Sequence, residues 1–496
     1  MTDSNKNDAP IPLWLALLPL ILLICMLALS VGLFSDDSSY GPNQIALLLA
    51  AGIASLVGLR LGLHWSDLEH AMVEGITLAL KACLILLAVG SLIGSWMLAG
   101  TAPAVIYFGL GILDPAWFYP AALLICALVS LSIGSSWTTA GTVGLALVGI
   151  AQIMDLSLAV TAGAVISGAY FGDKMSPLSD TTNLSPAMVG ADLFVHIRHM
   201  AWTTGPSVVI ALVLFTIMGL NAKAGQAPAS EINAARDLLE QNFTIGIPTL
   251  LPLALLLALA MRKVPAFPAI SIGALAGCVV ALVWQPDLVR NFADPDGTMS
   301  AWAASAKGLL MALADGFSIE TGDAGLDELL SRGGMSSMLN TIWLIMSAMC
   351  FGGVMERTGL LQRIVDQLMK GVRGTGSLIA TTVFTCIGMN IIAADQYIAI
   401  VLPGRMYRLE FERRGLAPQN LSRTLEDAGT MTSALVPWNT CGAFMAATLG
   451  VPTLSYLPYA FVNLLNPITA IVYGMTNFTI KPLEPEHKRE SAPLEA

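Results

Sequence analysis

Charged residues are scarce in this sequence. Only 12% of its 496 residues are Asp, Glu, Lys or Arg, whereas soluble globular domains average about 25%. Since 55% of the residues are hydrophobic and the mean hydropathy is +0.72, the composition excludes a disordered chain and argues against a large soluble domain. Basic residues are fewer than acidic ones, 24 against 34. Because phosphate binding needs clustered Lys and Arg, we expect no nucleic-acid partner.

Cysteine is also rare, and its seven positions show no metal-ligand spacing. All of them lie in or beside apolar runs, so we interpret them as small hydrophobic residues buried in a membrane protein rather than as disulfides. The sequence therefore predicts neither a structural metal nor a cofactor.

Long apolar runs are what the sequence has in place of charge. The run 11–34 is long enough to span a bilayer and lacks a convincing signal-peptide cleavage site. Gly, Pro and polar clusters interrupt several of the later runs, so we predict an all-α polytopic membrane protein with about 10–13 transmembrane helices, re-entrant hairpins and broken helices. The polar stretches 221–242 and 285–339 are too short for a catalytic domain, and we predict that the protein is not an enzyme. The later runs are 44–62, 75–98, 117–133, 140–172, 201–220, 244–261, 264–285, 338–355, 376–403, 428–449 and 453–476.

An internal repeat divides the chain. Three short matches occur in the same order, at offsets of 259, 254 and 259 residues: 94–100 with 353–359, 132–139 with 386–393, and 180–183 with 439–442. Three ordered matches at nearly one offset indicate a duplication. The predicted segments are N-terminal scaffold helices (1–74), a first inverted repeat (75–200), connecting helices and polar loops (201–337), a second inverted repeat (338–476) and a cytoplasmic tail (477–496).

Basic residues are distributed unequally between the two copies. The segment 405–423 contains five Arg, and its counterpart 145–164 contains no basic residue. Because cytoplasmic loops collect Lys and Arg, we expect equivalent loops on opposite sides of the membrane and both termini in the cytoplasm. Such inverted-topology repeats are typical of secondary transporters, whose substrate and ion sites lie near the midplane between the copies.

Four polar clusters interrupt the apolar runs, two in each copy: 134–141, 172–183, 388–396 and 426–442. Irregular backbone at membrane depth has to line a cavity or be buried in protein, so these clusters are candidates for a site. They supply the oxygen ligands that a small hard cation prefers. The residues that offer these ligands are Ser135, Ser136, Thr138, Thr139, Ser179, Asp180, Thr181 and Thr182 in the first copy and Asp395, Gln396, Asn439 and Thr440 in the second.

Carboxylates inside a membrane are costly, so they suggest function. The candidates are Asp173, Asp180, Glu356, Asp395 and Asp427. A desolvated carboxyl group can hold a proton and release it when a cation arrives, and this is sufficient for Na⁺/H⁺ exchange at one competing site.

Some of these residues also have structural interpretations. Asp173 can pair with the adjacent Lys174, and Glu426 together with Asp427 can mark the N-terminus of a helix. Lys81, which is flanked by Leu and Ala within a span, can either counter a carboxylate or extend toward the membrane surface. The sequence leaves these alternatives open.

The segment 167–183 (SGAYFGDKMSPLSDTTN) closely resembles the characteristic motif of the NhaC family of Na⁺/H⁺ antiporters, and the segments 134–144 and 437–440 are similar to further blocks of that family. The resemblance implies scaffold helices and two inverted repeats with re-entrant hairpins. The second hairpin tip departs from the family pattern, with Asn390 and Asp395 in place of small hydroxyl residues. The ion-binding residues that the resemblance implies are Ser135, Ser136, Thr138, Asp180, Thr181, Asn183, Asn439 and Thr440, with Asp180, Asn183, Asn439 and Thr440 as sodium ligands.

We therefore expect a carrier in the bacterial cytoplasmic membrane that exchanges Na⁺ for H⁺, with the lipid bilayer and small cations as its partners and with a homo-oligomer as an open question. The alternative is an antiporter that exchanges organic acids, such as malate for lactate, together with sodium and protons. A carboxylate substrate needs a cationic anchor, and the four polar clusters contain only one lysine, Lys174. This scarcity favours cation exchange.

Overall fold

The computed structural model describes residues 11–34, 38, 40–222 and 228–483. Within these residues the regular secondary structure is helical throughout, apart from an isolated bridge between Leu416 and Pro482. The prediction of an all-α fold is confirmed.

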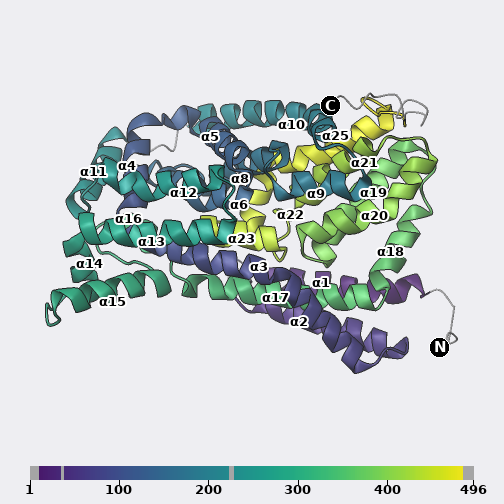
Figure 1. The fold of residues 1–496 in the computed structure, drawn as a ribbon, viewed down its shortest axis with the longest axis horizontal. Coiled ribbons are helices and arrows are strands. Elements are labelled where there is room, and N and C mark those ends of the chain that lie inside the picture. The colour runs from purple at the N-terminus through teal and green to yellow at the C-terminus, as the bar shows by residue number, and fades with distance from the viewer. Residues whose placement is uncertain (1–10, 35–37, 39, 223–227, 484–496) are drawn as a thin grey trace, which may run out of the picture.

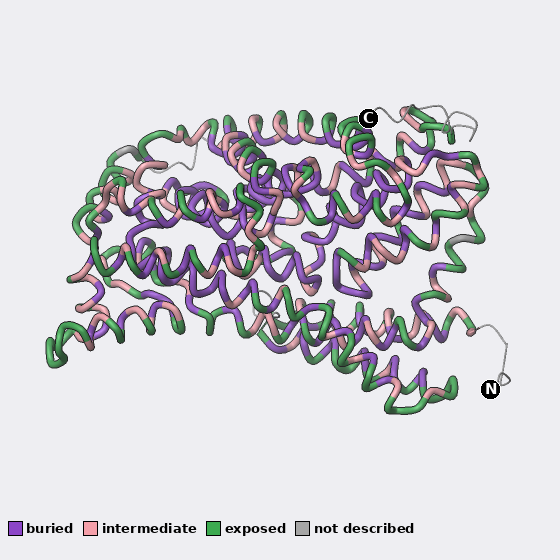
Figure 2. Tube along the Cα trace, viewed as in Figure 1, coloured by how far each residue is buried: buried purple, intermediate pink, exposed green. Residues whose placement is uncertain are grey.

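Nine helices in the described part of the chain are long and apolar enough to cross a membrane, and two bent helix pairs raise this number to as many as eleven. This count overlaps the predicted range. Figure 2 shows buried residues concentrated in the middle of the molecule, with exposed residues along its outer helices. The exposed residues of α10 (Leu193–Asn221) and α13 (Ala266–Trp284) include large apolar ones such as Val213 and Val279, which suits contact with lipid.

Long helices from the N-terminal segment, from the start of each repeat and from the connecting segment pack together. α1 (Leu13–Phe34) packs against α2 (Pro42–Arg60), α2 packs against α17 (Leu339–Arg357), and α17 and α13 both pack against α3 (Trp65–Leu98). The other connecting helices are α11 (Ala229–Asn242), α12 (Leu251–Met261), α14 (Pro286–Ala293), α15 (Ala301–Ala314) and α16 (Ala324–Leu330).

The helix order that begins with α3 recurs from α17 onward. Two π-helical turns interrupt it, η3 (Ala140–Gly144) in the first copy and η7 (Glu426–Thr430) in the second. The corresponding elements are α3 with α17, α4 (Thr101–Ile112) with α18 (Leu360–Met369), α5 (Phe118–Ile133) with α19 (Thr375–Ile392), α6–η3–α7 (Ser136–Ile153) with α20 (Gln396–Arg413), α8 (Leu158–Met175) with α21 (Pro418–Leu425), η7 and α22 (Met431–Ser433), α9 (Asp180–Val189) with α23 (Thr440–Leu449), and α10 with α25 (Phe461–Thr476).

Left-handed backbone marks the same joints in both copies. A residue with positive φ lets the chain turn where a helix ends. Four pairs of such residues lie 259 or 260 residues apart, so the duplication extends to the backbone conformation of the joints. The pairs are Gly100 and Gly359 (φ 73° and 70°), Gly134 and Ala394 (75° and 56°), Asp155 and Gly415 (52° and 66°), and Gly190 and Gly450 (75° and 70°).

This correspondence corrects one of the sequence matches. Pairing 132–139 with 386–393 is wrong by six residues, because Gly134 at the first tip corresponds to Ala394 and not to Gly388. Positive φ is easiest for glycine, and an alanine at the second tip hides the match. Asn390 consequently lies within α19 rather than at the tip.

Equivalent helices lie at opposite ends of the molecule. In Figure 1, α4 is at the left and its counterpart α18 is at the right. Packing between the copies is also reciprocal: α9 packs against α20, and their counterparts α23 and α6–η3–α7 also pack together. The same holds for α10 with α21 and for α25 with α8. Reciprocal contacts are expected of a two-fold relation between the copies, and their inverted orientation across the membrane stays a prediction.

Several of the apolar runs are not single spans. The run 140–172 is divided between α7 (Leu145–Ile153) and α8 by a turn that contains Asp155, and the run 376–403 is divided between α19 and α20 at Ala394. The expected segment boundaries at residues 75 and 201 fall inside α3 and α10. The division into five segments therefore stays a prediction, and the tail beyond residue 483 lies outside the described residues.

Candidate functional site

The first copy contains two breaks at which one helix ends and a polar residue caps the next. α5 ends before left-handed Gly134, and the Ser135 side chain then accepts a hydrogen bond from the backbone N–H of Thr138 (3.2 Å) at the start of α6. α8 ends at Met175, and Ser179 caps α9 in the same way. Side-chain oxygens of this kind satisfy the free N–H groups of a helix N-terminus.

The second copy repeats both breaks with other residues. Asp395 caps α20 by accepting hydrogen bonds from the N–H groups of Tyr397 (2.9 Å) and Ile398 (3.1 Å). Asn439 caps α23 by accepting one from the N–H of Cys441 (3.0 Å). Thr440, the first residue of α23, hydrogen-bonds Asp395 Oδ2 over 3.4 Å, so the two breaks of this copy touch.

Asp173 is buried at the end of α8 and joins the two breaks of the first copy. Its Oδ2 accepts hydrogen bonds from the N–H (3.1 Å) and the hydroxyl (2.6 Å) of Ser136. The expected pairing with Lys174 is wrong, because Lys174 pairs with Asp427 instead. Adjacent residues on a helix point in different directions, so the Asp173 and Lys174 side chains contact different neighbours of α8.

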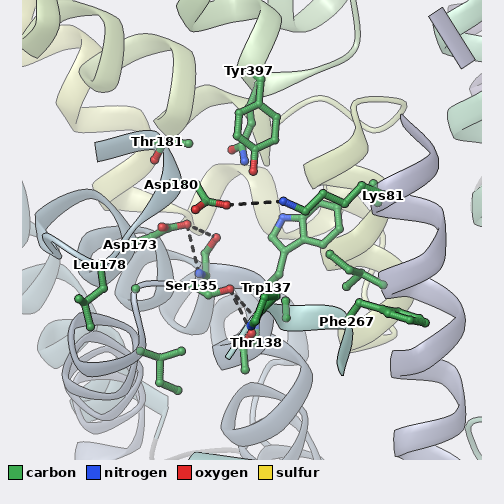
Figure 3. A pocket seen from close by; sticks show the side chains of 18 of the residues that line it. Lys81, Ser135, Trp137, Thr138, Asp173, Leu178, Asp180, Thr181, Phe267 and Tyr397 are labelled. Carbon is green, nitrogen blue, oxygen red and sulfur yellow. Dashed lines mark hydrogen bonds and ion pairs between the residues drawn. The ribbon is translucent and has the colours of Figure 1, made fainter. Parts of the chain in front are cut away.

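A cavity of about 830 Å³ brings most of the predicted site residues together. Figure 3 shows Asp173, Asp180, Ser135 and Thr138 around it, with Tyr397 directed into the same space. Residues from helix breaks of both copies line this cavity. The predicted residues among them are Ser135, Ser136, Thr138, Asp173, Asp180, Thr181, Asn183, Asp395 and Thr440.

Lys81 enters this cavity from α3 and decides one of the open alternatives. Its Nζ lies 3.9 Å from Asp180 Oδ2, and the two side chains are 75% and 72% exposed. Figure 3 shows the pair facing each other across the cavity. Lys81 therefore counters a carboxylate. Lys263 also lines the cavity, so the lining contains three carboxylates and two lysines.

Asn390 and Asn439 lie behind the cavity rather than in its lining. The Asn439 side-chain amide donates to the carbonyl and the side-chain oxygen of Asn390, both over 3.1 Å. Asn390 in turn donates to the Gly429 carbonyl (2.7 Å) and to the Thr432 hydroxyl (2.9 Å). These bonds hold the second pair of broken helices together.

Comparison with known proteins agrees with this arrangement. The sequence profile described as "Na+/H+ antiporter family" matches residues 168–478. The chain belongs to the Na⁺/H⁺ antiporter (NhaC) family. It is 41% identical to the Na⁺/H⁺ antiporter NhaC of Alkalihalophilus pseudofirmus, over 87% of this chain and 89% of that protein. It is 36% identical to the malate-2H⁺/Na⁺-lactate antiporter of Bacillus subtilis (95% and 96% covered) and to the arginine/ornithine antiporter ArcD of Halobacterium salinarum (96% and 94% covered).

Membership of this antiporter family identifies the chain as a multi-pass membrane transporter and not as an enzyme. Relatives that the chain matches at similar identity are named for inorganic cations, organic acids and amino acids. The family alone therefore leaves the transported substrate undetermined.

The antiporter also contains a buried charged cluster, in which Asp427 is the one member predicted from the sequence as a functional carboxylate. Lys174, Arg423, Glu426 and Asp427 are each 0% exposed. Lys174 pairs with Asp427 and donates to Asn466 Oδ1 (2.6 Å), while Arg423 Nε lies 3.9 Å from the other oxygen of Asp427. The four residues come from α8 of the first copy and from α21 and η7 of the second.

The interpretation of Glu426 and Asp427 as residues at a helix N-terminus is wrong. The helical segment that contains them begins at Pro418, and both lie in the π-helical turn η7 in its interior. Isolated π-helical turns often occur at functional sites because they redirect side chains. A π-helical turn has no signal in the sequence, although the adjacent carboxylates Glu426 and Asp427 place this one within a predicted polar cluster.

A second cavity, of about 1250 Å³, lies on the far side of the helix breaks in this antiporter. Leu145, Trp438 and Ala443 line it, together with residues of α1 and α17. Trp137, which lines the first cavity, stacks on Phe444 with 4.1 Å between ring centroids. Ala443, the residue before Phe444, lines the second cavity, so the helix α23 that carries Phe444 contacts both regions.

Proposed function

We propose that the protein exchanges Na⁺ for H⁺ across the bacterial cytoplasmic membrane. The observation that carries this proposal is the cavity in which carboxylates from helix breaks of both copies meet among hydroxyl groups. Helix N-termini stabilise charged carboxylates by their dipoles. Such carboxylates can bind Na⁺ together with hydroxyl and amide oxygens.

Asp173 is the central residue of the proposed site. It is 6% exposed, and Ser136 donates two hydrogen bonds to one of its oxygens, which leaves the other for a cation or a proton. A bound cation excludes the proton and a bound proton excludes the cation, because both neutralise the negative charge of Asp173. Asp180, Asn183 and Thr440 line the same cavity, and we keep them as proposed sodium ligands. Asn439 positions these groups from behind.

Two cavities, one lined by Trp137 and the other by Ala443 next to its stacking partner Phe444, support alternating access. In this proposal the site opens to each side in turn as one repeat moves against the other. The basic residues of segments 356–373 and 405–423 favour a cytoplasmic location for that end of the molecule and for both termini. Assembly into a homo-oligomer is a further proposal, and no residue is assigned to its interface.

A second candidate function has specific support. The cavity is large enough for a small organic molecule, and Lys81 and Lys263 line it. These two lysines supply the cationic anchor that the four polar clusters lack. An antiporter that exchanges organic acids with Na⁺ and H⁺ is therefore the alternative.

Transport by the purified protein in proteoliposomes separates the two candidates. A Na⁺ gradient is imposed, and the internal pH is followed with a fluorescent dye. We expect a Na⁺-dependent pH change without any organic solute, and none when choline replaces Na⁺. A pH change that appears only after malate or lactate is added would transfer the proposal to the organic-acid antiporter.

A further inference from the structure

Glu426 is a buried carboxyl group that the proposed site does not use. Its side chain is 0% exposed and lies outside the residues that line the cavity. One oxygen, Oε1, accepts a hydrogen bond from the Ser185 hydroxyl at 2.6 Å. The other oxygen, Oε2, makes no hydrogen bond of good geometry among the described residues, and the Thr430 hydroxyl, which is also unpaired there, is the donor close to this carboxyl group. A buried ionised carboxylate with an unpaired oxygen is costly, so this environment favours a bound proton.

The surrounding charges act in the opposite direction. Lys174 and Arg423 carry two positive charges, and Asp427 balances only one of them. An ionised Glu426 makes the cluster neutral, whereas a protonated Glu426 leaves it with one excess positive charge. Desolvation therefore favours the protonated form of Glu426, whereas the neighbouring cations favour its ionised form. A group that carries a proton needs such a balance, because it has to accept the proton and release it again.

Other titratable groups lie on the elements packed against η7. The charged groups on these elements that are buried are Asp173 and Lys174 on α8, Arg423 on α21 and Asp427 on η7 itself. The remaining titratable groups on these elements are Tyr170 on α8, Asp180 on α9, His196, Arg198 and His199 on α10, Cys386 on α19, Tyr397, Arg405, Tyr407, Arg408, Glu410, Glu412 and Arg413 on α20, and Tyr473 on α25. In the part of the chain that the structure describes, none of these histidine, cysteine or tyrosine groups hydrogen-bonds Glu426, so the charged cluster is its main electrostatic environment.

Helix α9 connects Glu426 to the cavity. α9 begins with Asp180, which lines the cavity, and Ser185 on the same short helix holds Glu426. The Thr182 hydroxyl donates to the carbonyls of Asp173 (3.0 Å) and Lys174 (2.8 Å), which ties α9 to the end of α8. A cation that binds at Asp180 and moves α9 therefore changes the hydrogen bond that stabilises ionised Glu426.

We propose that Glu426 carries a second proton in the exchange cycle, at a buried position outside the cavity and linked to it through α9. When the cation binds, the O–H bond of Glu426 breaks, the electron pair stays on the carboxylate and the proton leaves to water. The proton is regained when the cation dissociates. This inference rests on the proposed Na⁺/H⁺ exchange.

Proton release by the purified antiporter tests this role. Na⁺ is added to weakly buffered protein with a pH indicator, and Na⁺ binding is measured by calorimetry on the same samples at constant ionic strength. We expect Glu426→Gln, which keeps the size and removes the titration, to bind Na⁺ but to release about one proton fewer per bound Na⁺ than the unchanged protein. Glu69→Gln is the matched control, because Glu69 is exposed.

A second variant covers the case in which Glu426→Gln does not fold. Ser185→Ala keeps Glu426 and removes its hydrogen-bond donor, so the same proton release should require a more alkaline solution. Equal proton release by Glu426→Gln and the unchanged protein, or no pH displacement in Ser185→Ala, would overturn the inference alone. An unchanged protein that releases no proton on Na⁺ addition would overturn the proposed function and this inference with it.

Discussion

The two copies place different chemistry on the same backbone. In the first copy, the Ser136 hydroxyl donates to Asp173 Oδ2 at 2.6 Å. At the positions 260 residues later in the second copy, the Ser433 hydroxyl donates to Gln396 Oε1 at 3.4 Å. The contact between the hairpin tip and the following helix is preserved, but only the first copy contains a carboxylate there. At these equivalent positions, the negative charge that can bind a cation therefore lies in the first copy.

The charged cluster shows the same asymmetry. The positions that correspond to Lys174 and Asp427 are Ala434 and Ser167, so the ion pair between copies occurs once and has no symmetric partner. If transport interchanges the conformations of the two copies, the two end states differ in the environment of these charges. The repeated backbone supplies the two conformations, and the unequal side chains make them energetically different.

The largest expected effect comes from removing the carboxylate of Asp173, whose equivalent in the second copy is Ser433. Asp173→Asn keeps the size and removes a charge that accepts two hydrogen bonds, so we expect Na⁺-driven proton flux to fall about 100-fold. Ser433→Ala at the equivalent position should stay within about threefold of the unchanged protein. The measurement is flux in proteoliposomes at matched protein content. Equal losses in the two variants would mean that the copies contribute alike.

The sequence predicted the cavity lining well because its signals are local. Gly, Pro and hydroxyl residues that interrupt apolar runs mark helix breaks wherever they occur, and the motif 172–183 contains one complete break. Nine of the eleven predicted site residues line the cavity for this reason. Asn390 and Asn439 have the right chemistry, but they use it to hold the helices together.

What the sequence missed depends on contacts between distant segments. The partner of Lys174 is Asp427, 253 residues away, and the partner of Asp180 is Lys81 on another helix. The sequence places Asp173 beside Lys174, but the helix directs the two side chains to different neighbours. The register of the second tip was lost because Ala394 occupies a conformation that usually identifies glycine.

A smaller effect should distinguish the two hairpin tips by stability. A Cβ atom on Gly134 would lie 2.7 Å from the backbone carbon and the Cβ of Leu178, and φ is +75°. Gly134→Ala should therefore destabilise the protein by about 2 kcal/mol or more. Ala394→Gly relieves positive-φ strain but frees the unfolded chain, so its net effect should stay within about 1 kcal/mol. Unfolding temperatures in detergent measure both. A large loss in Ala394→Gly would show that the tips are not equivalent.

The smallest effect concerns Lys81, whose equivalent position 259 residues later is Asn340 on α17. The Lys81 ammonium lies 3.9 Å from Asp180 and competes with a cation for that carboxylate. Both side chains are largely exposed to the cavity, so the attraction is screened, and Lys81→Gln should raise the apparent Na⁺ affinity by up to about fivefold. The affinity is measured from the Na⁺ dependence of flux, with choline chloride holding the ionic strength constant. In an Asp180→Asn background, Lys81→Gln should not raise the apparent Na⁺ affinity, because the carboxylate for which Lys81 and Na⁺ compete has been removed. A gain of equal size in both backgrounds would mean that Lys81 acts on Na⁺ through the charge of the whole cavity rather than through Asp180.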